Sequence, residues 1–297
     1  MKKTIPLLAQ TKGRLRRFGL RARKGLGQHF LIDEAVLQNV ISAAALSSSD
    51  VVVEVGPGLG VLTRELAKQA GVVLAIELDS QLAGILEQDT APLGNVSIIN
   101  ADVLQVEPVD LLQEQKAKFP TLVDTSCRYK VVANLPYYIS SHFLRHFFEA
   151  SVKPGVMVIM VQKEVAEAIV AGPGQMSVLS VSVQFYGKPE IISYVSAECF
   201  YPVPEVDSAI LRVEIYPEPA VAVTDEKSFF ELVRAGFSAS RKQIANSLAQ
   251  GLGCSKAEAL SLLAGAGLVP RRRAETLTLS EWARLWLVFI QTRESVC

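Results

Sequence analysis

The chain has 297 residues, 49% of them hydrophobic, so it can bury a sizeable core, and global disorder is excluded. Its formal net charge is zero, but residues 1–24 hold nine basic residues and no acid, residues 25–224 hold 11 basic and 23 acidic residues, and residues 225–297 hold 10 and 7. The two basic ends favour a polyanionic partner, and no apolar run approaches the ~20 residues of a membrane-spanning helix.

The basic stretch at residues 1–24 lacks the apolar core of a secretory signal. We expect a flexible, solvated arm, although an arm that contacts phosphates and a mitochondrial transit peptide both fit the same composition. The four cysteines contain no CxxC pair, which argues against a zinc site or a disulfide framework and favours a reducing, cytoplasmic location. They are Cys127, Cys199, Cys254 and Cys297.

Strand and helix patterns alternate from residue 50 to about residue 161. A helix is expected over residues 61–70, and buried strands are expected over residues 51–55, 72–78, 96–100, 130–134 and 156–161. Such alternation predicts right-handed βαβ units, and therefore a parallel sheet with helices on both faces. A late strand over residues 208–216 is expected to join the same sheet.

Helical spacing returns after residue 225 and predicts a small all-helical domain, with Trp282, Trp286 and Phe289 in its core. We therefore predict an α/β protein of the Rossmann-like class with four parts. They are a basic arm over residues 1–24, the α/β domain over residues 25–217, a linker over residues 218–224 and the helical domain over residues 225–297.

A glycine-rich turn, EVGPGLG, follows the first predicted strand. Gly56, Gly58 and Gly60 allow a tight turn and a close approach of the backbone to a ligand. Glu77 ends the second strand, where its carboxylate can accept hydrogen bonds from both hydroxyls of a ribose. NAD enzymes share these features, although their usual spacing is GxGxxG, and a helix-start turn with incidental glycines is a second alternative.

A second acid, Asp102, follows the third strand in the sequence NADVL. Its carboxylate can accept a hydrogen bond from the exocyclic amine of an adenine. The alternative is an aspartate that caps a helix or stabilises a turn.

The sequence ANLPYYIS places an amide, a proline and an aromatic ring at the end of the fourth strand. An adenine amine must become tetrahedral to attack a methyl group, and two fixed acceptors favour that shape in the transition state. The Asn134 side-chain oxygen and the Leu135 carbonyl are the expected acceptors, and Pro136 fixes the turn. Tyr137 can stack on a base that has left its helix. The alternative is an ordinary strand-to-loop turn.

Two histidines share a helix face, but no third ligand is near, so we expect His142 and His146 to be packing or surface residues and expect no metal site. Direct methyl transfer to an amine requires no metal ion.

In this combination of motifs the chain resembles the small-subunit (16S) rRNA adenine dimethyltransferase family, KsgA/RsmA type, from residue 24 to about residue 290. The motifs that carry the resemblance are KGLGQHFLID, EVGPGLGVLT, AIELD, NADVL, ANLPYYIS, MVQKEVA, FYPVPEVDSAI and SRKQIANSL. The resemblance implies a class I S-adenosylmethionine-dependent methyltransferase sheet. It implies as substrate two adjacent adenines in a hairpin loop near the 3′ end of 16S rRNA, within immature small subunits, and we expect a monomer.

Matching positions imply roles for further residues. Phe200 would sandwich the target base against Tyr137. The residues implied at the donor site are Gln28, His29, Leu31, Gly56, Gly58, Glu77, Asp102 and Asn134. Those implied in RNA docking are Arg241, Lys242, Arg271, Arg272 and Arg273.

Some positions depart from the family pattern. His29 stands where Asn is frequent. Residues 177–185 have the β-branched content of a strand, while the resemblance predicts a helix, which we favour. Alternative functions are a large-subunit rRNA methyltransferase of the macrolide-resistance type, a mitochondrial homologue, a non-catalytic ribosome assembly factor and, more distantly, an NAD oxidoreductase.

Overall fold

The computed structural model describes residues 5–23, 25, 27–123, 128–239 and 241–294. Residue 24, Cys127 and Cys297 lie outside this part, and the described Cys199 and Cys254 are free thiols. The chain divides into two compact units, Met1–Ala166 with Glu190–Ile215 and Glu167–Pro189 with Tyr216–Cys297. The predicted domain boundaries placed residues 167–189 in the first part, whereas compactness groups them with the second.

Within the described residues, a seven-stranded sheet has the strand order β4-β3-β2-β5-β6-β9-β7. Its strands are β2 (Val51–Val55), β3 (Val72–Glu77), β4 (Val96–Asn100), β5 (Lys130–Asn134), β6 (Val156–Gln162), β7 (Gly187–Val195) and β9 (Ser208–Ile215). The order confirms the predicted α/β sheet, including the late strand. β7 was missed, because it includes a proline and because Ile192 and Tyr194 occupy exposed positions, so its sequence does not alternate between apolar and polar residues.

The register places the carboxyl ends of the parallel strands at one edge. Strands β4, β3, β2, β5 and β6 run parallel, and β9 pairs antiparallel with β6, with Ser208 opposite Gln162. All residues of β2 and β3 are buried, as is usual for strands covered on both faces. Because the strands end together, the residues that follow them meet at this edge.

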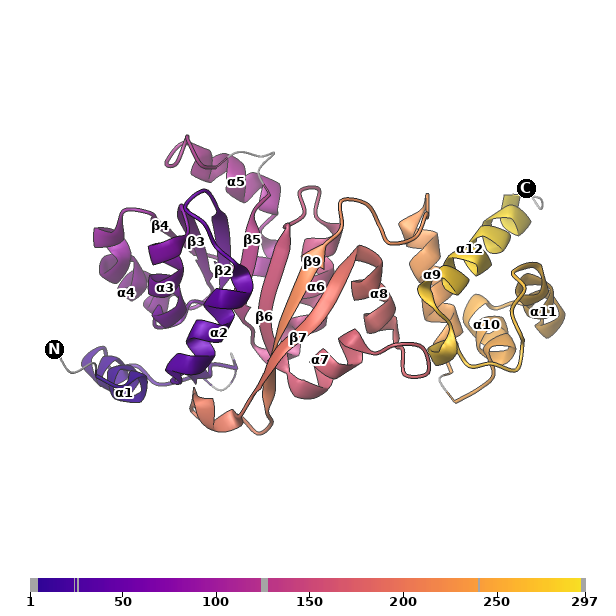
Figure 1. Ribbon diagram of the computed structural model, residues 1–297, viewed down its shortest axis with the longest axis horizontal. Helices are drawn as coiled ribbons and strands as arrows, with labels where there is room; N and C mark the ends of the chain where they lie inside the picture. The colour runs from indigo at the N-terminus through magenta and orange to yellow at the C-terminus, as the bar shows by residue number, and fades with distance from the viewer. Residues whose placement is uncertain (1–4, 24, 26, 124–127, 240, 295–297) are drawn as a thin grey trace. The chain divides into compact units, whose positions relative to one another are not determined.

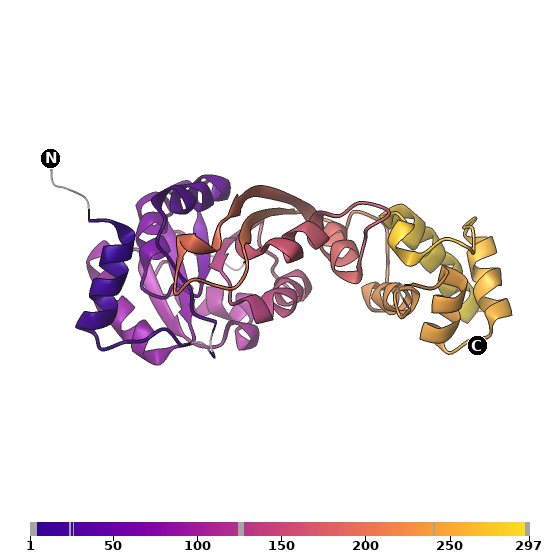
Figure 2. The same cartoon turned by 90° about the horizontal axis from the view of Figure 1, so that it is seen from below.

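Helices cover both faces of the sheet, and Figure 2 shows α2 on one side and α6 on the other. Among the described residues up to Val170, the α-helices are α1 (Leu7–Arg17), α2 (Glu34–Ala44), α3 (Val61–Gln69), α4 (Ser80–Thr90), α5 (Pro108–Lys116), α6 (Ser140–Glu149) and α7 (Lys163–Val170). Side chains of α2 and α3 share a core with the sheet, including Val40, Leu66 and Val132. The ring of His146 on α6 meets Phe147 edge-on, and its Nε2 lies 3.0 Å from the Val106 carbonyl oxygen.

The N-terminal segment differs from the predicted flexible arm. Residues 7–17 form α1, and Leu7, Thr11 and Leu15 are buried at a spacing of four residues (Figure 1). This spacing gives the helix one packed face, and its many charges occupy the rest. A second, two-stranded sheet pairs β1 (Phe30–Leu31) with β8 (Phe200–Tyr201).

The second unit is helical, as predicted. Its helices are α8 (Val178–Tyr186), α9 (Glu226–Gly236), α10 (Ile244–Leu252), α11 (Lys256–Gly265) and α12 (Leu279–Glu294). The helix favoured for residues 177–185 is confirmed as α8, and Phe185 stacks on Phe229 with ring centroids 5.0 Å apart. This contact explains why α8 belongs to the second unit. Trp282, Trp286 and Phe289 are buried, as predicted.

Candidate functional site

A cavity of about 280 Å³ lies at the carboxyl edge of the sheet, where β2, β3 and β5 end. Ligands of open parallel sheets bind at this edge. The cavity is lined by residues 27–31, 55–59, 61, 62, 76–78, 101–104, 134–139 and 160. The fold thus brings together every residue implied at the donor site and the whole of Asn134–Tyr137.

The glycine-rich turn forms one wall through backbone conformations that favour glycine. Gly56, Gly58 and Gly60 have φ values of 69°, 55° and 70°. A Cβ atom at Gly58 would lie 3.2 Å from the ring of Phe30, so a side chain there would crowd the cavity wall. The turn is therefore built for close approach of a ligand to the backbone.

Glu77 is anchored beside this turn. Its Oε2 accepts a hydrogen bond from the backbone N–H of Gly58 at 3.0 Å, and its Oε1 accepts one from that of Asp79 at 2.9 Å. Burial raises the pKa of Glu77, and the nearby Asp79 carboxylate raises it further, while the two N–H groups lower it. Each oxygen retains a lone pair, so the carboxylate can still accept hydrogen bonds from a ligand's hydroxyl groups.

Asp102 lines the cavity after β4 and also caps a short helical turn. Its Oδ1 accepts a hydrogen bond from the Leu104 backbone N–H at 3.0 Å. The capping alternative from the sequence is therefore present together with the cavity position. Capping holds the carboxylate at one wall, where it can accept a further hydrogen bond.

The segment before α2 closes the cavity from another side. The His29 carbonyl accepts a hydrogen bond from Asn134 Nδ2 at 3.0 Å, and the His29 Nδ1 lies 2.7 Å from the Pro202 carbonyl. The His29 ring also stacks on Tyr137, with centroids 6.0 Å apart and planes 15° apart. His29 therefore contacts the end of β5 through both its backbone and its ring.

The end of β5 has a fixed geometry. The bond to His29 holds the Asn134 amide, which leaves its oxygen as the acceptor that faces other partners. The Tyr137 hydroxyl lies 2.8 Å from the Ser208 hydroxyl of β9, and burial raises the pKa of Tyr137. Ser208 was missed from the sequence, although it lies within the quoted segment FYPVPEVDSAI.

Phe200 does not face the cavity. Its side chain is 1% exposed and belongs to the apolar core that includes Leu31 and Val195. The strand pair β1–β8 places Phe200 directly opposite Leu31. Phe200 is thus not among the residues that line the cavity, and its predicted stacking on a base opposite Tyr137 stays a prediction.

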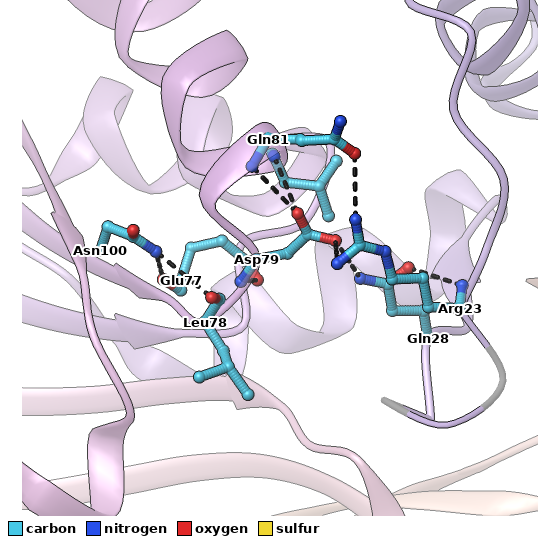
Figure 3. Close-up of polar contacts among 8 residues, drawn as sticks. Arg23, Gln28, Glu77, Leu78, Asp79, Gln81 and Asn100 are labelled. Atoms are coloured by element: carbon cyan, nitrogen blue, oxygen red, sulfur yellow. Dashed lines mark hydrogen bonds and ion pairs between the residues drawn. The ribbon is translucent and has the colours of Figure 1, made fainter.

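A polar network missed from the sequence lies behind Glu77 (Figure 3). Arg23 and Gln28 both contact the Asp79 carboxylate, at 3.2 and 3.4 Å. On the other side, Asn100 Nδ2 donates to the Glu77 carbonyl at 2.8 Å. The useful signal was the position of Asp79, two residues after Glu77 and directly before α4.

Glu54 is a second buried carboxyl group near the cavity. Its side chain is 1% exposed, and burial, with a further contribution from Glu77, raises the pKa of Glu54 to about 8. The group therefore retains its proton at neutral pH.

The basic residues predicted to dock RNA behave differently from one another. Arg272 pairs with Glu281 through two contacts, at 2.5 and 3.0 Å, and holds the pKa of Glu281 at about 2. Arg272 thus stabilises the second unit itself. Arg241, Lys242, Arg271 and Arg273 are exposed.

Among the described residues, no helix is both long and apolar enough to cross a membrane. No group of three or more His, Cys, Asp or Glu side chains in that part of the chain is arranged to hold a metal ion.

Known proteins are similar in sequence to this chain over most of its length. The family model described as Ribosomal RNA adenine dimethylase matches residues 19–285. Ribosomal RNA small subunit methyltransferase A of Dehalococcoides mccartyi (strain ATCC BAA-2266 / KCTC 15142 / 195) is 49% identical over 288 residues, which cover 97% of this chain and 95% of that protein. The protein of the same name from Moorella thermoacetica is 42% identical over 282 residues, or 93% and 95% of the two chains.

Solved structures share the fold. The 23S rRNA methyltransferase ErmE matches with a TM-score of 0.67 at 27% identity, over 88% of this chain and 100% of that one. A dimethyladenosine transferase from Plasmodium falciparum matches with a TM-score of 0.74 at 24% identity, over 89% and 98% of the two chains. The predicted class I methyltransferase fold is thereby confirmed, and the chain belongs to the ribosomal RNA adenine dimethylase family.

Proposed function

We propose that this protein uses S-adenosylmethionine to dimethylate the exocyclic amines of two adjacent adenines in a hairpin loop near the 3′ end of 16S rRNA. The observation that carries the proposal is the end of β5, where His29 fixes the Asn134 amide at the cavity wall beside the Tyr137 ring. Membership of the adenine dimethylase family supports the same reaction.

In the proposal the cavity holds an adenosyl donor. The glycine wall would admit the ligand close to the backbone, Glu77 would accept from the ribose hydroxyls, and Asp102 would accept from the adenine amine; their positions in the lining support these roles. Gln28, His29 and Leu31 line the side next to Asn134. When bound, S-adenosylmethionine supplies an electrophilic methyl group, and the proposed chemistry requires no metal ion.

Asn134 and Leu135 would hold the target amine. In the proposal, the Asn134 oxygen and the Leu135 carbonyl accept the two amine hydrogens and so favour the tetrahedral nitrogen of the transition state. Pro136, with φ −57°, fixes the turn between them and Tyr137. The amine loses one proton to solvent in each transfer, so an adenine with two amine hydrogens can be methylated twice.

Tyr137 would capture the base. Its ring is held from two sides, by the Ser208 hydroxyl and by the stacked His29 ring. A ring held in this way can stack on an extruded adenine with little loss of side-chain entropy. The hydroxyl is occupied with Ser208, so stacking is the contribution that the ring offers.

The relatives favour the small subunit as substrate. Both carry the name of a small-subunit methyltransferase and match almost the whole chain, including the helical unit. We propose immature small subunits in the cytoplasm as the partner, with the protein acting as a monomer. Exposed Arg241, Lys242, Arg271 and Arg273 are proposed to contact phosphates.

The test is mass spectrometry of rRNA after incubation of the protein with methyl-labelled donor and, separately, immature small subunits or protein-free large-subunit rRNA. We expect two adjacent N6,N6-dimethyladenines near the 3′ end of 16S rRNA and no label in 23S rRNA. Label in 23S rRNA would support the macrolide-resistance type instead. Binding to small subunits without transfer would support a non-catalytic assembly factor.

A further inference from the structure

Residues 5–23, here called the strap, are packed against the first unit. The side chains of Leu7, Thr11 and Leu15 are 8%, 1% and 7% exposed. Leu15 packs in one apolar cluster with Phe30 and Leu59, which also line the main cavity. The strap therefore lies directly behind part of the cavity wall.

Two ion pairs attach the strap to α4 and to the turn before it. Arg14 pairs with Asp89 on α4, and Arg23 pairs with Asp79 at 3.2 Å. The Arg23 side chain is half exposed, whereas that of Asp79 is 3% exposed. Loss of Arg23 would therefore leave a buried carboxylate without its cationic partner, which is unfavourable.

Arg23 makes further contacts at the same point (Figure 3). Its Nη2 donates to Gln81 Oε1 at 3.0 Å, and its backbone N–H donates to Gln28 Oε1 at 2.9 Å. Gln28 in turn donates to Asp79 at 3.4 Å. One residue of the strap thus holds both Asp79 and Gln28, and Gln28 lines the cavity.

Asp79 connects this group to Glu77. The Asp79 backbone N–H donates to Glu77 Oε1 at 2.9 Å, and the Asp79 carboxylate caps α4 through the backbone N–H groups of Gln81 and Leu82. A shift of Asp79 would therefore move a hydrogen-bond donor of Glu77. The path from strap to cavity consists of direct contacts, Arg23 to Asp79 to Glu77.

We propose that Arg23 is a positioning residue for the donor site, and that docking of the strap and binding of S-adenosylmethionine are coupled through the Arg23–Asp79 ion pair. The inference rests on the proposed function, because it concerns the regulation of the same site. Coupling is reciprocal, so a bound donor must also hold the strap in place. Donor binding requires no RNA, which separates this role from any contact of the strap with phosphates.

The first measurement is calorimetric binding of S-adenosylhomocysteine to the full chain. Arg23→Ala is expected to weaken binding roughly 5- to 50-fold, since it removes a charged hydrogen-bond partner from a buried carboxylate. Arg23→Lys keeps the charge and should stay within about threefold of the unmodified protein. Arg21→Ala is the matched control, because Arg21 is an exposed arginine of the same strap, and it should leave affinity unchanged.

The second measurement asks whether Arg23 acts through Asp79. Asp79→Asn should also weaken binding of S-adenosylhomocysteine. The double variant should bind no more weakly than the single variant with the lower affinity, because both substitutions remove the same Arg23–Asp79 contact. In hydrogen exchange, S-adenosylhomocysteine should slow exchange of residues 5–23 in the unmodified protein, and Arg23→Ala should abolish that slowing.

The outcomes separate the two proposals. If the unmodified protein does not bind S-adenosylhomocysteine, the proposed function fails and this inference fails with it. If the unmodified protein binds but Arg23→Ala binds equally well, only the positioning role is overturned. Additive losses of binding free energy in the double variant would also overturn the coupling. So would hydrogen exchange of the strap at the same rate with and without S-adenosylhomocysteine.

Discussion

The cavity edge of the first unit and the surface of the helical unit differ in how well the sequence predicts the positions and partners of polar residues. At the cavity edge, residues from six separate sequence segments line one space, and most of these segments lie where parallel strands end together. On the helical unit, five basic residues were expected to act alike, yet Arg272 is engaged with Glu281. Backbone topology gathers residues predictably, whereas surface charges find partners that no sequence spacing reveals.

The largest expected effect is at Asn134. Asn134→Ala should lower the rate of methyl transfer ~100- to 1,000-fold, the usual loss for one preorganised polar contact in a transition state. Single-turnover transfer from labelled donor to immature small subunits measures it. Asn39→Ala, on the exposed face of α2, is the control. Equal rates of methyl transfer in the two variants would show that Asn134 has no catalytic role.

Glu54 tests the charge environment of the cavity edge. Its pKa is raised to about 8 from 4.5, so its contribution to stability is complete below about pH 4.5 and is lost as pH rises towards 8. The loss is at most ~1.4 kcal/mol per pH unit, or ~2.7 kcal/mol between pH 6 and pH 8. Glu54→Gln should remove this slope.

Urea unfolding at several pH values measures that slope. Glu87→Gln, at an exposed position of α4, should retain the slope of the unmodified protein. If Glu54→Gln and Glu87→Gln show the same pH dependence, the carboxyl group of Glu54 is not held protonated by burial.

Glu77 tests the donor side of the cavity. Glu77→Ala should weaken binding of S-adenosylhomocysteine by ~1–3 kcal/mol, because a charged hydrogen-bond partner is lost. Calorimetry measures the change, with Glu87→Ala as the exposed control. Unchanged affinity in Glu77→Ala would show that the ribose does not bind at the end of β3.

The smallest effect separates two neighbouring arginines of the helical unit. Arg271→Ala should lower the salt dependence of RNA binding by about one unit of slope, if the exposed Arg271 contacts a phosphate. Arg272→Ala should instead lower the stability of the protein, because Glu281 loses its partner. RNA binding titrated against salt, together with urea unfolding, distinguishes them. A loss of slope in both variants with no loss of stability would contradict the structural role of Arg272.

The sheet was predictable because its strands are short apolar runs between turns and helices. The clustering of Gly56, Glu77, Asp102 and Asn134 at one edge was predictable for the same reason, since each ends or follows a strand that the pattern identifies. The roles of these residues stay predictions. Sequence spacing did not reveal which partners a residue meets in the fold. Phe200 pairs with Leu31 across the two-stranded sheet and is buried in the apolar core, and it is not among the residues that line the cavity.

The strap was missed for a related reason. Its high charge predicted a solvated arm, but the four-residue spacing of Leu7, Thr11 and Leu15 provides a packed face. The partners of its arginines, Asp79 and Asp89, lie far away in the sequence. Charge composition alone therefore could not distinguish an arm from a docked helix.

The most direct test of the central claim is an experimental structure of the protein with S-adenosylhomocysteine and a hairpin RNA that contains the two adjacent adenines. We expect the ribose at Glu77, the ligand's adenine at Asp102, and the amine of one extruded RNA adenine within ~3 Å of the Asn134 oxygen and the Leu135 carbonyl. An extruded adenine bound away from Asn134, or a ligand outside the cavity, would contradict the account.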